Sequence, residues 1–381
     1  MNARMNPNRK VIANSSRLNA LMDEAGLDAL VLRSGQNFTY LSGVVYPGTL
    51  MRHMDLTDST RPVVLLWPRN GEPVILTNKT AEGLARRDGW VDKVVLYEAY
   101  VDSPQEKLAD VIREAGLASA KVGFEKDYFS AQHWETLQKA LPKMQMAECT
   151  GLMDRVRWVK TDEEVQMIRR AADRLDDAYL ETFKRIRHGD TERKIHADMM
   201  GTCLRLGFEW AHGILNSFKN TIPYAGESDF VIEKGDAIRT DYVGYLQSYP
   251  GHQSRTVVMG APSAEQKRDY AINLEVHRKT LDRCRAGANV HALWQATMND
   301  YAAVGWPDHH MLIGHGVGAW WHQQEPILRR KSPHVLEEGM VLALEPHVNF
   351  WHLQDMVLVT NAAPILLSPK FSTDEPFVAD A

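Results

Sequence analysis

Two patterns of hydrophobic and polar positions alternate along the first 150 residues. One is helical: after a capping serine, Leu18, Leu21, Met22 and Leu27 recur at helical spacing, and PQEKLADVIREAGL is a second amphipathic stretch. The other consists of short apolar runs bounded by Pro, Gly or charged residues, namely residues 29–32, PVVLLWP, EPVILT and DKVVLY. Helices that alternate with short strands predict an α/β domain.

A long amphipathic helix is predicted to open the second part of the chain. The segment KTDEEVQMIRRAADRLDDAYLETFKRI begins with a Thr cap and acidic residues, and it places Val165, Ile168, Ala172, Leu175 and Tyr179 on one stripe. No Gly/Ser linker precedes it near Arg157. We therefore expect two domains, residues 1–157 and 158–381, joined by a short connection.

Composition agrees with two cores and excludes several classes of partner. The chain has 381 residues, a length beyond that at which a single hydrophobic core stops growing, and 44% of its residues are hydrophobic. Its net charge is -5 and its basic residues are interspersed with acids, so we expect no nucleic-acid partner. The polar start and short apolar runs predict no membrane partner and a cytoplasmic protein. The three cysteines lie far apart and are expected to be reduced thiols.

Histidines concentrate near the end of the chain: eight of the fifteen fall between His291 and His352. Upstream, GDAIRTDYVGYLQSYPGHQSRTVVMG predicts a hairpin with Asp241 on one strand and His252 on the next. LIGHGVGAWWHQQEP predicts a glycine-flanked turn at His315, with His322 seven residues later.

The last candidate residues lie at the end of one strand and along another. GMVLALEPHVNF ends an apolar strand on Glu345, and WHLQDMVLVT alternates so that His352, Gln354 and Met356 share a face. A buried carboxylate at a strand end needs a partner. The sequence thus predicts a pocket in the second domain.

The order of these blocks resembles a known superfamily. A strand Asp, an SRT triplet, GHGVG, GMVLALEP and the final LQDMVLVT strand are similar to creatinase, aminopeptidase P, prolidase and methionine aminopeptidase, which form peptidase family M24. The segment LDALVLRSGQNFTYLSG resembles the opening of their first domain. The resemblance implies a creatinase-like N-terminal α/β domain, a C-terminal pita-bread α/β domain that holds the active site, and a homodimer.

The resemblance also implies a set of metal ligands. Metallo-members hold two ions with two Asp, one His and two Glu. Asp241, His315 and Glu345 match three of these positions, whereas the second Asp position is His252 and the last Glu position is Gln354. In the family both missing carboxylates bridge the ions, and a neutral group cannot offset the repulsion between two cations equally well.

Two further positions concern substrate. The family carries a histidine upstream of the first Asp, where TIPYAGESDF places Tyr224. His212 is near that segment in sequence. His322 matches the family's second pocket histidine, which contacts substrate.

Two enzymatic hypotheses follow. In one, His252, His315 and a carboxylate, Glu345 or Asp241, hold one Zn, Mn or Fe ion that activates water. In the other, the pocket is metal-free as in creatinase: His252 or His315 is the general base, oriented by Glu345 or Asp241, and His322 protonates the leaving nitrogen. In the metal-free hypothesis Tyr224 and Arg255 orient the substrate.

Either hypothesis predicts hydrolysis of a C–N bond in a small amino-acid-like molecule. Three alternatives stay open: a conventional metal-dependent Xaa-Pro dipeptidase or aminopeptidase, a lyase of the same superfamily, and a binding protein without catalysis. The candidate metal ligands are Asp241, His252, His315, Glu345 and Gln354; the candidate catalytic residues are His322, Tyr224, Arg255 and Glu345; and the candidate substrate-binding residues are Tyr224, His322 and Arg255.

Overall fold

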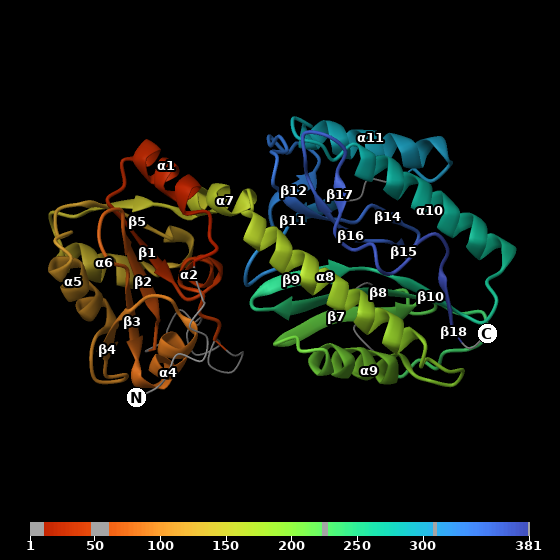
Figure 1. Cartoon of the computed structure of the whole chain (residues 1–381), viewed down its shortest axis with the longest axis horizontal. Coiled ribbons are helices and arrows are strands. Elements are labelled where there is room, and N and C mark those ends of the chain that lie inside the picture. The colour runs from red at the N-terminus through yellow and green to blue at the C-terminus, as the bar shows by residue number, and fades with distance from the viewer. Residues whose placement is uncertain (1–10, 47–60, 223–227, 308–310, 380–381) are drawn as a thin grey trace. The chain divides into compact units, whose positions relative to one another are not determined.

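The computed structural model describes residues 11–46, 61–222, 228–307 and 311–379. These residues divide into two compact units, with the boundary between Arg157 and Trp158. Both units are mixed α/β structures (Figure 1). Among the described residues, no helix combines the length and apolar character needed to cross a membrane.

The first unit is built on a six-stranded sheet with the order β4-β3-β2-β1-β5-β6. β1 pairs antiparallel with β2 and parallel with β5, and the sheet continues through antiparallel β2–β3 and parallel β3–β4 and β5–β6 pairs. The strands are β1 (Ala29–Arg33), β2 (Val64–Pro68), β3 (Val74–Asn78), β4 (Lys93–Tyr97), β5 (Lys121–Phe124) and β6 (Gln145–Glu148). All four apolar runs noted in the sequence are strands of this sheet, as predicted.

Helices flank this sheet, and two of them share a hydrophobic core with its strands. Several begin with a side-chain cap; Ser103, for example, accepts from the backbone N–H of Glu106 and is followed by a proline at the first helical position. The helices are α1 (Ser15–Ala25), α2 (Gln36–Ser42), α4 (Lys79–Asp88), α5 (Pro104–Glu114), η1 (Lys126–Tyr128), α6 (Ala131–Ala140) and α7 (Thr150–Trp158).

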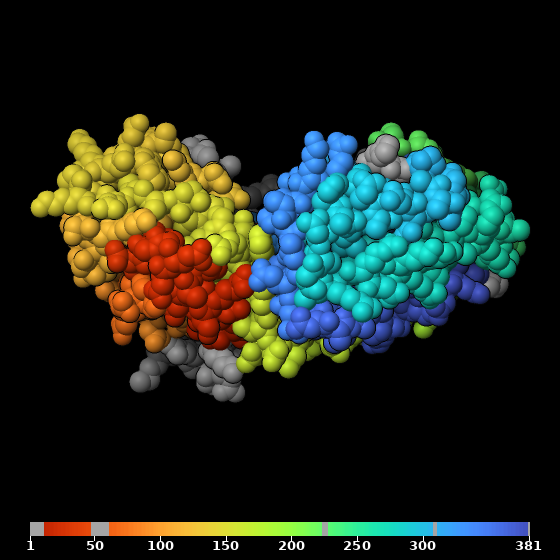
Figure 2. Space-filling model, turned by 90° about the horizontal axis from the view of Figure 1, so that it is seen from above, coloured from red at the N-terminus to blue at the C-terminus, as the bar shows by residue number. Residues whose placement is uncertain are grey.

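Four helices of the second unit cover its strands from outside. α8 (Asp162–Phe183) begins at Thr161 with the predicted cap, packs on β8 and β9, and is followed by α9 (Glu192–Arg205), which packs on β7. α10 (Ala264–Asp282) packs on β14 and β15, and α11 (Val290–Ala303) on β11 and β12. Figure 2 shows α10 and α11, in turquoise to light blue, along one outer face of this unit.

The strands between these helices form two main sheets. One has the order β18-β10-β8-β7, with β9 also pairing with β8; the other has the order β12-β11-β13-β16-β17; and β14 pairs with β15 in a small hairpin. The strands are β7 (Trp210–Ser217), β8 (Ala237–Leu246), β9 (Tyr249–Gln253), β10 (Thr256–Met259), β11 (Leu312–Gly316), β12 (Gln324–Arg329), β13 (Val341–Leu344), β14 (His347–Val348), β15 (Trp351–His352), β16 (Asp355–Leu358), β17 (Ile365–Leu366) and β18 (Phe377–Ala379).

The predicted hairpin is present, because β8 and β9 are antiparallel and Val243 pairs with His252. The turn predicted at His315 is wrong: this residue lies in β11, between β12 and β13. Its flanking glycines serve close approach, since a Cβ at Gly314 would lie 2.5 Å from Ala343 O and one at Gly316 2.4 Å from Glu325 O.

Candidate active site

A cavity of about 820 Å³ lies in the second unit. One wall follows β8, where Arg239, Asp241 and Val243 all face the cavity because alternate residues of a strand point to the same side. The remaining lining comes from β7, β9, β11, the loop after β11, and the β14–β15 hairpin. It includes His212, His252, His315, Trp321, His322, Glu345, His347, Phe350 and His352. Two carboxylates and several imidazoles therefore share one cavity.

A chain of hydrogen bonds fixes His252. Ser254 Oγ donates to Gln354 Oε1 at 2.9 Å, so the Gln354 amide donates to His252 Nδ1 at 3.2 Å. The other ring nitrogen, Nε2, then donates to Asp241 Oδ1 at 2.9 Å. Both nitrogens of His252 are thereby engaged, and Gln354 is fully buried behind the ring.

Asp241 is held as a carboxylate. Burial raises its pKa, but His252, and to a smaller extent His352 and His322, lower it by more, so its pKa lies well below the ordinary value. A carboxylate that stays ionised at the cavity wall can hold a cation or a substrate ammonium group, but it is a weak base.

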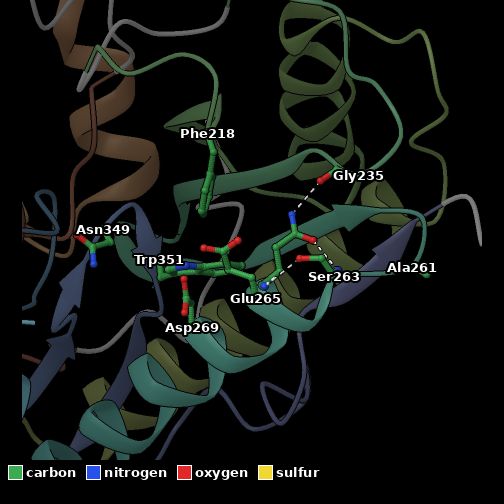
Figure 3. A pocket seen from close by; sticks show the side chains of 9 residues that line it. Phe218, Gly235, Ala261, Ser263, Glu265, Asp269, Asn349 and Trp351 are labelled. Atoms are coloured by element: carbon green, nitrogen blue, oxygen red, sulfur yellow. Dashed lines mark hydrogen bonds between the residues drawn. The ribbon is translucent and has the colours of Figure 1, made fainter. Parts of the chain in front are cut away.

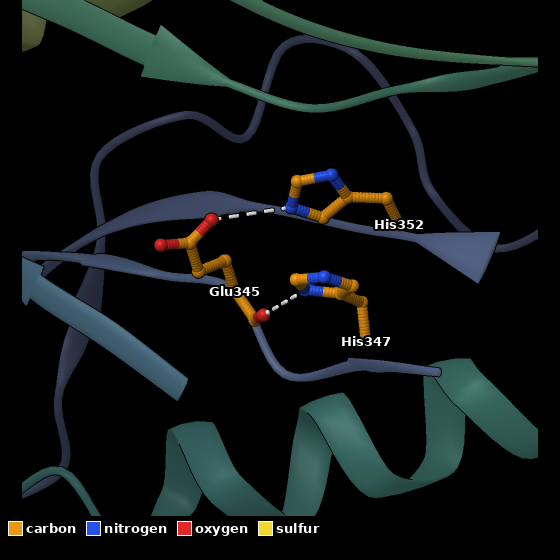
Figure 4. Close-up of side chains that lie close together, drawn as sticks. All are labelled: Glu345, His347 and His352. Carbon is orange, nitrogen blue, oxygen red and sulfur yellow. Dashed lines mark hydrogen bonds and ion pairs between the residues drawn. The ribbon is translucent and has the colours of Figure 1, made fainter. Parts of the chain in front are cut away.

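Glu345 directs its carboxylate at two imidazoles. His352 Nε2 lies 3.2 Å from Oε2 and His315 Nε2 lies 3.7 Å from Oε1. His315 Nδ1 is 2.9 Å from Gly316 O and therefore carries the proton, which leaves Nε2 as the acceptor on the Glu345 side. His347 Nδ1 likewise donates to Glu345 O at 2.8 Å (Figure 4). Glu345, preceding Pro346, stands at the end of β13 as the sequence predicted.

His322 is kept neutral and oriented by Tyr245. Tyr245 Oη accepts a hydrogen bond from the backbone N–H of His322 at 3.1 Å and lies 3.0 Å from His322 Nδ1. We therefore assign the tyrosine hydroxyl as the donor to Nδ1. Nε2 of His322 then carries the ring proton. Burial lowers the pKa of His322, and the nearby His252, His315 and His212 lower it further. His322 can therefore donate a hydrogen bond as a neutral imidazole.

His212 stands next to His322 in this part of the cavity. Its ring centroid is 4.9 Å from that of His322, and the ring stacks on Trp321 at 5.6 Å. Burial lowers the pKa of His212 to about 4, and His252 adds to the effect. Tyr224, the predicted substrate contact, lies outside the described residues.

The role predicted for Arg255 needs correction. Its guanidinium has no exposed surface, forms ion pairs with Asp176 at 3.1 Å and Asp355 at 3.0 Å, and donates to Gln354 O at 2.6 Å. It does not line the cavity. A side chain enclosed in this way cannot contact a substrate; it ties α8 to β16, which begins at Asp355, next to Gln354.

The cavity also contains residues that the sequence left undecided or unmentioned. His347 and His352 pair across the β14–β15 hairpin, with ring centroids 4.2 Å apart. Arg239 is buried at the cavity wall, where its Nε donates to Asn216 Oδ1 at 2.8 Å and its guanidinium carbon lies 4.9 Å from the centre of the Phe350 ring. The alternation Arg239, Asp241 along β8 is the signal that could have identified the arginine.

A second hollow, of about 410 Å³, lies at the N-terminus of α10 (Figure 3). Phe218 and Trp351 meet edge to face in it, at 4.8 Å. Gln266 forms the helix cap with Ser263 and also donates to Gly235 O, while Arg268 pairs with Asp269 at 2.9 Å. Because these polar groups serve the helix start and a surface ion pair, we do not regard the hollow as the active site.

Comparison with known proteins identifies the fold family. Residues 166–361 match metallopeptidase family M24, and residues 15–159 match the creatinase/prolidase N-terminal domain. The chain belongs to metallopeptidase family M24. The structure is similar to that of an Xaa-Pro dipeptidase from Bacillus anthracis, with a TM-score of 0.79, 22% identity, and coverage of 96% of this chain and 99% of that one.

Named relatives of this M24 protein are peptidases. An Xaa-Pro dipeptidase from Lactobacillus delbrueckii subsp. lactis is 22% identical over 349 residues, which cover 88% of this chain and 89% of the relative. An Xaa-Pro dipeptidase from Pyrococcus horikoshii is 27% identical over 237 residues, which cover 59% of this chain and 67% of the relative.

Of the five residues that the sequence resemblance matches to metal ligands, the two matched to bridging carboxylates, His252 and Gln354, are not acidic. Four carboxylates and one His would face two divalent cations in a metallo-member, but here only Asp241 and Glu345 are acidic. The two replacements, His252 and Gln354, hydrogen-bond to each other instead of presenting lone pairs to a shared ion. Two cations a few Å apart would therefore lack both bridging charges.

Proposed function

We propose that this M24 protein hydrolyses a C–N bond of a small amino-acid-like molecule in the cavity of its second unit. The observation that carries the proposal is the meeting of Asp241, Glu345, His315 and His322 at one cavity wall. Family membership supports the reaction type, because the named relatives are dipeptidases.

The chain's own residues supply a proton path. Glu345 accepts a proton from the attacking water and returns it to the nitrogen that leaves as the C–N bond breaks, so that one water is consumed for each bond. Neutral His322 donates its Nε2 proton in a hydrogen bond to the substrate carbonyl oxygen, where negative charge develops. Burial of both side chains strengthens these interactions.

The charges on β8 support an amino-acid-like substrate. Arg239 and Asp241 lie two residues apart on the same face of the strand, about 7 Å by strand geometry. A guanidinium binds a carboxylate and an ionised carboxylate binds an ammonium group. A dipeptide zwitterion matches both charges, and an N-acyl or N-carbamoyl amino acid matches the arginine through its carboxylate alone, so both are favoured over neutral amides.

The reaction can be tested with a panel of Xaa-Pro and other dipeptides, N-acyl amino acids, ureas and amidines, incubated in ¹⁸O-labelled water. We expect hydrolysis of a zwitterionic or carboxylate-bearing compound with one ¹⁸O in the product. Glu345→Gln should lower kcat about 10²–10⁴-fold, whereas the exposed Glu375→Gln, a matched control, should retain activity. An unsaturated product without ¹⁸O would show a lyase, and an inert panel with measurable binding would show a binding protein.

A conventional Xaa-Pro dipeptidase is the second candidate, favoured by the names of the relatives. It requires that the site bind two ions despite His252 and Gln354. Release of the N-terminal residue from Xaa-Pro substrates alone, with two equivalents of added Mn²⁺ bound, would support it over our proposal.

A further inference from the structure

We propose that the cavity binds a single zinc-type cation through Glu345, His347 and His352, a site that keeps Glu345 from the ligand positions implied by the resemblance and adds two histidines outside them. Among the described residues, these three bring one ligand atom each to within 4.8 Å of one another. Ligands bonded at about 2.1 Å to a common ion lie about 3.4–4.2 Å apart, so small side-chain movements suffice. Figure 4 shows the two imidazoles, one above the other, beside the Glu345 carboxylate.

The hairpin that carries both histidines is built to bring them together. His347 on β14 and His352 on β15 are directly paired across it. Its two connecting residues, Asn349 and Phe350, have φ values of 52° and 67°, as a two-residue turn with left-handed residues requires. An aromatic residue is unfavourable there, and such strain is common at functional sites. Phe350 lines the cavity and contacts Arg239.

The tautomer of His347 is already that of a metal ligand. Its Nδ1–H donates to Glu345 O at 2.8 Å, which leaves Nε2 with the lone pair. Histidine ligands in proteins usually donate their second nitrogen to a carbonyl or carboxylate in this way. His315 has the same arrangement through Gly316 O, and its Nε2 lies 3.7 Å from Glu345 Oε1. Its side chain would have to move to join the three as a further imidazole, because its ligand atom is not among those within 4.8 Å of one another.

His352 must move its ring proton from Nε2 to Nδ1 before Nε2 can bind an ion. In the structure its Nε2 is 3.2 Å from Glu345 Oε2 and shares a proton with that oxygen. An ion between them replaces this proton, which moves to Nδ1. The ion then has one carboxylate and two or three imidazoles, with an open side toward the cavity.

These ligands select the chemical class of the ion. Imidazole nitrogen suits Zn²⁺, Co²⁺ and Fe²⁺, whereas Mg²⁺, Ca²⁺ and Mn²⁺ prefer oxygen ligands. The negative charge of a single carboxylate also offsets the charge of one divalent ion better than that of two divalent ions. Glu345 would hold the ion through Oε2, the oxygen beside His352, and keep Oε1 to accept the proton of the attacking water. The inference thus deepens the proposed function, on which its catalytic meaning rests, and zinc binding can be measured without any substrate.

Zinc binding by the full chain, freed of metal by a chelator, tests the site. Titration calorimetry and elemental mass spectrometry should give one equivalent of Zn²⁺, and X-ray absorption of the zinc-loaded protein should count two or three imidazole ligands. His347→Gln and His352→Gln should weaken binding at least about 100-fold. His252→Gln, which alters a family ligand position, is the matched control and should keep the affinity within a few-fold.

Three results would overturn the site: no zinc bound by the wild type, zinc retained by both hairpin variants, or loss of zinc in His252→Gln but not in those variants. Circular dichroism of each metal-free variant separates loss of a ligand from unfolding, and the ligand count of the wild type needs no variant. Zinc binding without hydrolysis would contradict the proposed function alone. Hydrolysis by protein that binds no zinc would contradict this site alone.

Discussion

Tyr245 controls His322 with a single hydroxyl group, which accepts the backbone N–H and is assigned as donor to Nδ1. In Tyr245→Phe we expect the buried N–H to lose its partner and the unfolding free energy to fall by about 1–3 kcal/mol. The ring of His322 should also lose its preference for the Nε2–H tautomer. Denaturant unfolding and ¹⁵N chemical shifts of labelled histidines measure the two effects.

Tyr301→Phe is the control for this variant, because Tyr301 is equally buried and donates to Asn273 Oδ1 at 2.8 Å, outside the cavity lining. It should lose stability without altering His322. If both variants leave the tautomer of His322 unchanged, Tyr245 does not set it.

Glu125 gives the first unit a dependence on pH. It accepts hydrogen bonds from Arg33 N and Asn37 Nδ2, both at 2.7 Å, and burial raises its pKa to about 7 despite these bonds. A carboxyl whose pKa is higher in the folded state stabilises the fold below its unfolded pKa of about 4.3, and that contribution is lost as the pH rises through 7. Stability should therefore fall from pH 4.5 to 7.5.

Glu125→Gln should flatten this part of the pH profile of the first unit, while the loss of one hydrogen bond to Asn37 lowers stability by about 1 kcal/mol at low pH. Chemical denaturation at several pH values provides the measurement. An unchanged slope between pH 4.5 and 7.5 would show that another group causes it.

At the scale of elements, β9 reaches the cavity only by passing very close to α8. A Cβ on Gly251 would lie 2.5 Å from Ala171 O and 2.6 Å from Ala171 C, both backbone atoms that cannot move aside easily. We expect Gly251→Ala to lower the unfolding free energy by about 1–3 kcal/mol and to displace the adjacent His252 from Asp241. Denaturant unfolding and ligand binding measure the two consequences.

Gly83→Ala serves as the comparison for Gly251→Ala. Gly83 lies within α4, and nothing stands within 4 Å of a Cβ built there. Alanine should stabilise this helix by up to about 1 kcal/mol. Equal effects of the two substitutions would mean that β9 can move away from α8 without loss.

The elements themselves were largely predictable from the sequence. Strands such as Val74–Asn78 and the helix after Thr161 follow from local period and caps, which need no knowledge of the rest of the chain. The glycines beside His315 were read as a turn because close packing between two neighbouring strands and a turn require the same residue. Only the sheet order distinguishes the two.

The sequence predicted which residues belong to the site better than it predicted the role of each. Asp241, His252, His315, His322 and Glu345 all reach the cavity, but the hydrogen bonds from Ser254 through Gln354 to His252 join two segments of the chain that are far apart in sequence. Arg255 was misassigned for the same reason, because its carboxylate partners lie 79 and 100 positions away. Sequence spacing carries no information about such pairings.

At the scale of the whole second unit, Arg255 joins segments that are far apart in sequence. It pairs with Asp176 of α8 and Asp355 of β16, and its side chain is fully buried. Burial raises the pKa of Asp176 to about 6 even though Arg255 lowers it. Removal of the arginine leaves two buried carboxyl groups without their cation, and such a loss costs about 3–5 kcal/mol.

Arg255→Met, which keeps most of the side-chain volume, should therefore lower the free energy of unfolding of this unit, and lower it by more at pH 8 than at pH 5. The pKa of Asp176 rises further once the guanidinium is absent, so the group is protonated and easier to bury at pH 5 but must be buried as an anion at pH 8. Guanidinium chloride unfolding at the two pH values measures the difference. Arg268→Met, at an exposed ion pair, should change stability by less than about 0.5 kcal/mol at either pH. If Arg255→Met were equally destabilising at both pH values, lost packing rather than stranded charge would explain the effect, and the ion-pair network could not be what holds Gln354 behind His252.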